Sequence, residues 1–103
     1  MNCNQLTELI HNLCLAEISY LKAKQERVQA ENHLNLTVNW EVVNGLREQD
    51  NLPKISNQKQ RDAFISDQIN GYKELENRRL VEFNRLQRIY ENREYLEYKP
   101  KGE

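Results

Sequence analysis

Histidine and cysteine are the side chains of this sequence best suited to metal binding or nucleophilic chemistry, and there are two of each. His11 and Cys14 are three residues apart, which puts them on neighbouring faces if the segment is helical. A zinc or nucleophilic site also needs a third ligand or an orienting group, and the residues around them supply none. His33 is too distant to help, and the sequence holds no glycine-rich phosphate loop. We therefore predict a non-catalytic protein without metal or cofactor.

The two cysteines also bear on the compartment. If Cys3 and Cys14 share one helix, they lie about 16 Å apart at ~1.5 Å per residue, too far for a disulfide. Residues 1–6 carry no basic group of the kind that opens a secretory signal. No apolar run approaches the roughly 20 residues of a membrane span. We expect a cytoplasmic protein with reduced thiols and no membrane contact.

Arginines form the second group of residues that could serve a function. Arg78, Arg85 and Arg88 share one face of a helix and could follow a row of phosphates. Acidic residues three or four positions away offer ion pairs instead, and the net charge of the chain is −1. A solvated face with paired arginines is therefore the favoured interpretation, and nucleic-acid binding is the alternative.

The elements that carry these residues follow from composition and periodicity. Of the 103 residues, 38% are hydrophobic and 30% are charged, with only 3 Gly and 2 Pro. This balance favours thin, elongated helices in one domain over a compact core. From residue 4 to 38 an apolar seam recurs in steps of four and three, broken only by Arg27, which predicts one long coiled-coil helix. The seam consists of Leu9, Leu13, Ala16, Tyr20, Ala23, Arg27, Ala30 and Leu34.

The same helix carries a second apolar row, rotated by about 100° from the first. A two-helix hairpin leaves this row in solvent, and exposed aliphatic rows of this length usually mark interfaces. A symmetric homodimer in which two hairpins form a four-helix bundle would bury it. The predicted oligomer interface is Ile10, Cys14, Leu21 and Val28.

A connector is expected over residues 39–56, where the periodicity fails. Asn44 and Gly45 read as a turn or helix stop, and Pro53 cannot lie inside a helix without a kink. Trp40 and its aliphatic neighbours are too apolar for a free linker. We expect a partly helical connector in which Trp40 covers the end of the hairpin.

A second long helix is predicted over residues 57–98, followed by a short tail over residues 99–103. Ser56 or Asn57 is the N-cap candidate, and Gln60 stands in the capping-box position relative to Asn57. Its apolar stripe runs from Ile65 to Tyr90, and Gly71 is its weak point.

Antiparallel pairing of the two helices predicts a register in which contacting positions sum to about 103. Each alanine of the first helix then faces a bulky side chain of the second, as close packing requires. The same register places Arg27 opposite Glu76, so the polar residue in each stripe meets the other. The fold class is thus all-α, an antiparallel coiled-coil hairpin.

The start of the second helix resembles a motif of small helical-hairpin proteins encoded by phages and mobile elements. That motif reads Ser or Thr, Asn, Glu or Gln, Lys, any residue, Arg, Asp or Glu, Ala, often with a tryptophan upstream. The matching residues here are Ser56, Asn57, Gln58, Lys59, Arg61, Asp62 and Ala63, with Trp40 upstream. The resemblance implies the hairpin fold and a phage-like origin, and it implies no activity.

Most of this motif is explained by helix capping, and Ala63 would allow close approach of the first helix. The alternative is a recognition surface of Lys54, Lys59 and Arg61 at a helix N-terminus. Taken together, the residues predict a protein that acts through protein–protein interaction, as a phage-like accessory factor whose partners are a second copy and an unidentified protein. The nucleic-acid-associated alternative uses Arg78, Arg85 and Arg88.

Overall fold

The computed structural model describes residues 1–93. This part of the chain is all-α and contains no strand. Its helices, in chain order, are α1 (Cys3–Thr37), α2 (Trp40–Gln49), α3 (Gln58–Gln68) and α4 (Asn70–Glu91).

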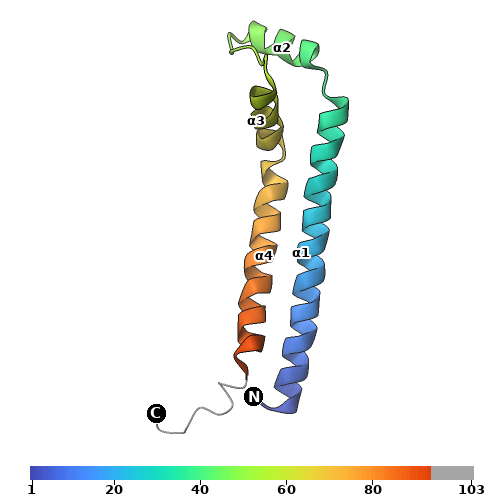
Figure 1. Ribbon diagram of the computed structural model, residues 1–103, viewed down its shortest axis with the longest axis vertical. Coiled ribbons are helices and arrows are strands. Elements are labelled where there is room, and N and C mark those ends of the chain that lie inside the picture. Colours follow the sequence, from blue (N-terminus) through green and yellow to red (C-terminus); the bar gives the residue numbers. More distant parts are fainter. Residues whose placement is uncertain (94–103) are drawn as a thin grey trace, which may run out of the picture.

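The molecule is a long, thin hairpin (Figure 1). α1 forms one arm, while α3 and α4 follow each other along the second arm and run antiparallel to the first. α2 lies across the end where the chain turns back, which we call the tip; the paired arms of α1 and α4 are called the shaft. The principal extents are 69 × 26 × 20 Å and the radius of gyration is 21.9 Å, against about 13 Å for a compact domain of this length.

α1 agrees with the helix predicted over residues 4–38. It begins with a capping box that was not predicted: the backbone N–H of Gln5 donates to Asn2 Oδ1 at 2.8 Å, and Asn2 N–H donates to Gln5 Oε1 at 2.9 Å. These bonds satisfy two N–H groups that a helix start otherwise leaves unpaired.

The second arm is not the single helix that was predicted. It is interrupted at Ile69, whose backbone (φ −99°, ψ 13°) leaves helical geometry between α3 and α4. Asn70 and Gly71 follow directly, and both are weak helix formers. The Lys73 ammonium donates to the Ser66 hydroxyl across the interruption. α4 ends at Glu91, and the predicted continuation over residues 94–98 and the tail over residues 99–103 lie outside the described residues.

The prediction of a turn at Asn44 and Gly45 was wrong, because both residues lie inside α2. The helix stops later, at a Schellman motif in which Leu52 N–H donates to Arg47 O at 2.8 Å and Asn51 N–H to Glu48 O at 3.1 Å. Asn51 supplies the left-handed residue of this motif, with φ 56°. The connector is therefore partly helical, as expected.

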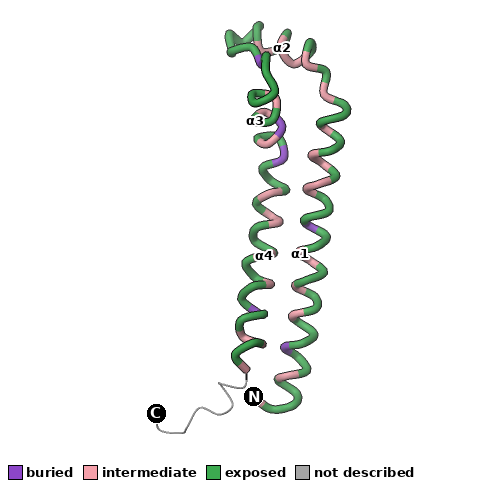
Figure 2. The backbone as a smooth tube through the Cα atoms, viewed as in Figure 1, coloured by how far each residue is buried: buried purple, intermediate pink, exposed green. Residues whose placement is uncertain are grey.

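The core is a narrow line of side chains between the arms, with most residues green and exposed in Figure 2. Ile69, at the interruption, is the most deeply buried side chain, with 1% exposed. So thin a core leaves many large apolar side chains in contact with solvent. Within residues 1–93, the buried side chains are Leu9, Ala23, Ile55, Ile65, Ile69 and Leu86.

Candidate functional site

Among the described residues, one ion pair crosses the shaft, in the half nearer the tip. Arg27 Nε donates to Glu76 Oε2 at 2.7 Å, and Arg27 Nη2 donates to Glu76 Oε1 at 3.3 Å. The guanidinium therefore binds both carboxylate oxygens in a bidentate contact. A third bond joins Arg27 Nη1 to Glu31 Oε2 at 3.2 Å on the same helix. The structure thus brings together the two polar residues that interrupt the apolar stripes.

This pair is part-buried, with 24% of the Arg27 side chain and 17% of the Glu76 side chain exposed. The hydrogen bonds from Arg27 lower the pKa of Glu76 below its ordinary value, against the opposing effect of desolvation. Hydrogen bonding to Glu76 raises the pKa of Arg27 in turn. Both groups are therefore held in their charged forms inside an otherwise apolar seam.

The side chains around this pair follow the same register. The rings of Tyr20 and Phe83, whose numbers also sum to 103, stack at 6.2 Å with an interplanar angle of 29°. Ala23 is 4% exposed and Leu86 is 9% exposed, so small and large residues fill the gap between the arms. At these positions the two arms form a packed seam.

The predicted interface residues lie on α1 as an outer stripe, defined as Ile10, Cys14, Leu21 and Val28. Ile10 is 38% exposed and Leu21 is 50% exposed, while the cysteine is exposed and the valine is half-buried. Sequence reasoning missed one neighbour of the stripe, Ile18 at 49% exposure. Leu15, at 65% exposure, lies farther round α1 on the side toward α4. The signal was present, since Ile18 stands four residues after Cys14 and three before Leu21.

The three predicted arginine contacts all lie exposed on α4. Arg85 is tied to Glu82 by two bonds, from Nη2 to Oε1 at 2.7 Å and from Nε to Oε2 at 3.0 Å. This pairing lowers the pKa of Glu82 and offsets the charge of the Arg85 guanidinium. Arg78 and Arg88 remain as the accessible charges of the proposed phosphate-binding face.

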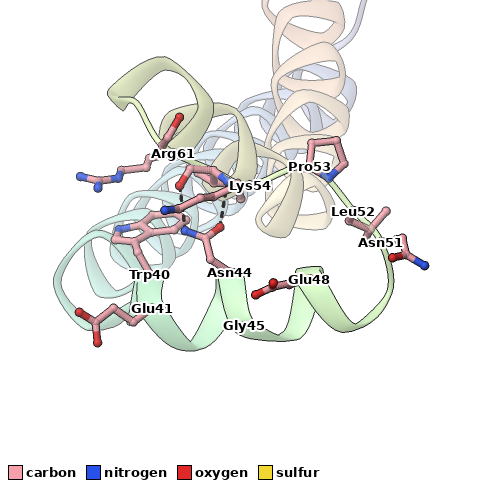
Figure 3. A pocket seen from close by; sticks show the side chains of 12 residues that line it. Trp40, Glu41, Asn44, Gly45, Glu48, Asn51, Leu52, Pro53, Lys54 and Arg61 are labelled. Carbon is pink, nitrogen blue, oxygen red and sulfur yellow. Dashed lines mark hydrogen bonds between the residues drawn. The ribbon is translucent and has the colours of Figure 1, made fainter.

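The tip is held by side chains that bind backbone groups (Figure 3). Asn44 donates through Nδ2 to Ile55 O at 2.9 Å, and Ile55 N–H donates to Asn44 Oδ1 at 2.8 Å. Arg47 Nε donates to Pro53 O at 2.7 Å. One amide therefore pairs with an extended backbone segment as a neighbouring strand would.

Trp40 joins the tip to the second arm, as its apolar character suggested. Its ring meets Phe64 edge to face at 5.5 Å, and the Arg61 guanidinium carbon lies 5.6 Å from the indole centroid. The Nε atom of Arg61 is buried and has no hydrogen-bond partner among the described residues. These contacts give the arginine of the motif, and the tryptophan upstream, a shared packing role.

The rest of the motif is a helix start. Asn57 and Gln60 form the predicted capping box, with Gln60 N–H donating to Asn57 Oδ1 at 2.9 Å. Ser56 N–H donates to Gln60 Oε1 at 2.8 Å. The prediction that Ala63 allows close approach of α1 was wrong, because Ala63 is exposed. Lys54 and Lys59 are exposed as well.

An open groove of about 1030 Å³ lies at the tip between α2 and the extended segment that follows it. Trp40, Lys54 and Arg61 line it together with Glu41 and Glu48, so its walls carry both signs of charge. This mixture favours no single ligand class.

The histidine and cysteine residues are not gathered into a metal site in the described part of the chain. No three His, Cys, Asp or Glu side chains of residues 1–93 gather closely enough to hold a metal ion. His11, Cys14 and His33 are all exposed on α1. Over the same residues, none of the helices combines the length and the hydrophobicity that crossing a membrane requires.

Comparison with models of protein families, with curated proteins and with solved structures gives no significant match.

Proposed function

We propose that this protein acts through protein–protein contact, as a non-catalytic helical hairpin whose first partner is a second copy of itself. The observation that carries the proposal is the outer stripe of α1, where Ile10 and Leu21 are 38% and 50% exposed on the surface of a hairpin with a very thin core. Burial of such a row stabilises an assembly by roughly 25 cal/mol per Å². Two hairpins joined there form a four-helix bundle.

The resemblance of residues 56–63 to phage and mobile-element hairpin proteins supports a place for this protein among accessory factors of that kind. Such a factor presents a rigid surface to a protein partner and supplies no chemistry. Exposed apolar side chains away from the stripe are available for a further partner. They include Leu36 near the end of α1, Val42, Leu46 and Leu52 at the tip, and Tyr72 and Val81 on α4.

Sedimentation equilibrium of Leu21→Glu tests the proposal. The charge at the centre of the stripe should convert a micromolar dimer into a monomer, because it leaves a carboxylate against apolar side chains. Val81→Glu is the matched control: Val81 is 57% exposed on α4, close to the 50% of Leu21, and should leave the dimer intact. Circular dichroism establishes that both variants keep their helices.

A wild-type protein that sediments as a monomer at micromolar concentration would contradict self-association. Nucleic-acid binding is then measured directly by a mobility-shift titration across salt. Binding that weakens steeply with salt and is lost in Arg78→Ala/Arg88→Ala would favour the alternative function.

A further inference from the structure

We infer that two copies associate with their α1 helices antiparallel, around a two-fold axis at Leu21. This inference rests on the proposed function and specifies the geometry of its interface. The outer stripe is placed symmetrically for such an axis, since Cys14 lies seven residues before Leu21 and Val28 lies seven residues after it. Leu21 then meets Leu21 of the second copy, and Cys14 meets Val28.

The apolar residues alone do not choose the direction, because a parallel pair would also match each of them with its own copy. The choice comes from the row beside them, which repeats every seven residues as Ile10, Glu17, Lys24 and Glu31. Glu31 is already bound to Arg27 at 3.2 Å. Glu17 and Lys24 are both exposed, and neither lies within ion-pair distance of an opposite charge in the described chain, although Lys24 is close enough to Glu76 to help lower the pKa of that carboxyl.

A parallel dimer sets Glu17 against Glu17 and Lys24 against Lys24, so both layers next to Leu21 carry like charges. An antiparallel dimer around Leu21 sets Glu17 of each copy beside Lys24 of the other, displaced by only one residue, about 1.5 Å along the axis. Two attractive pairs then flank the apolar centre. Glu17 and Lys24 alternate with the apolar residues in steps of three and four, so they lie in the seam itself. Charged residues within a helical seam set partner orientation in this way.

Cys14 makes the orientation measurable by disulfide cross-linking. In a Cys3→Ser background, copper–phenanthroline oxidation should leave the chains unlinked, because Cys14 faces Val28 of the other copy. Adding Val28→Cys should give covalent dimers joined through positions 14 and 28, identified by peptide mass mapping. An intrachain bond is excluded, since fourteen helical residues span about 21 Å. The matched control is Val81→Cys in the same background, which should not cross-link.

Charge reversal gives an independent readout. Glu17→Lys should raise the dimer dissociation constant about tenfold at low salt, and Glu17→Lys/Lys24→Glu should return it to within about threefold of wild type. In a parallel dimer the single change replaces one like-charge layer with another and leaves affinity unchanged. A bond between two Cys14 residues, or a stable dimer that Val28→Cys fails to link, would overturn the antiparallel geometry alone. A monomeric wild-type protein would overturn the proposed function as well.

Discussion

The shaft and the tip of this hairpin are stabilised in different ways. In the shaft, apolar side chains interlock along a repeating seam, and one ion pair between Arg27 and Glu76 interrupts them. In the tip, the connections run from polar side chains to backbone groups, as from Asn44 to Ile55 and from Arg47 to Pro53. The stability of the shaft depends on a periodic pattern of apolar residues, whereas that of the tip depends on particular polar residues.

The difference follows from how each region satisfies its backbone. Helices in the shaft bond their own N–H and C=O groups, so any sequence with the right periodicity serves. The extended segment after α2 has no strand beside it, and its polar groups need partners from elsewhere. A substitution in the shaft should therefore act through packing and register, and one in the tip through unmet hydrogen bonds.

The largest effect is expected at the ion pair of the shaft. Arg27→Leu leaves the Glu76 carboxylate part-buried without its partner, and we expect unfolding to require about 2–4 kcal/mol less free energy. Arg27→Leu/Glu76→Leu should recover much of that loss, since leucine suits both stripes. Urea denaturation followed by circular dichroism measures both values.

The control for these Arg27 and Glu76 variants is Arg85→Leu. It removes the arginine of an ion pair whose two side chains are 53% and 50% exposed. It should change stability by less than about 1 kcal/mol. If the double variant is no more stable than Arg27→Leu alone, the pair is not coupled across the hairpin, and the expectation that shaft substitutions act through register fails.

A smaller loss is expected at the tip. Asn44→Ala removes both bonds to Ile55, and an unmet pair of part-buried backbone groups should destabilise the tip by about 2 kcal/mol. Hydrogen exchange of the Ile55 amide should accelerate roughly thirtyfold, the factor that corresponds to this energy. Asn84→Ala on the exposed surface of α4 is the matched control and should leave the exchange unchanged. An equal acceleration in the shaft would show that the two regions unfold as one unit.

The smallest effects are expected at two of the three glycines, Gly45 in the tip and Gly71 in the shaft. A Cβ atom at Gly45 in α2 or at Gly71 in α4 would meet no atom within 4 Å. Each change to alanine should therefore stabilise the protein by about 0.5–1 kcal/mol through helix propensity alone. The melting temperatures of both variants and of the wild type, measured by thermal denaturation, test this expectation. A loss of stability at Gly71 would show that the interruption beside Ile69 requires glycine, which would distinguish it from the regular shaft.

Periodicity and capping signals are what the sequence alone determined. The steps of four and three fixed the long helix α1, and the match of Arg27 with Glu76 predicted the register in which the structure places them. The capping box of Asn57 and Gln60 was readable for the same reason, because it depends on neighbours along the chain. The equivalent spacing of Asn2 and Gln5 carried the same signal and was overlooked.

Only the tertiary structure decided where the helices depart from the boundaries that the sequence pattern predicts. Asn44 and Gly45 read locally as a turn, yet they lie within α2, because the amide of Asn44 finds its partners on Ile55 eleven residues away. The break at Ile69 is invisible in the apolar stripe, since the stripe stays in phase on both sides and Ile69 remains the most buried side chain. Local propensities decide a helix only where no distant contact competes, and at the tip the contacts between Asn44 and Ile55 prevail.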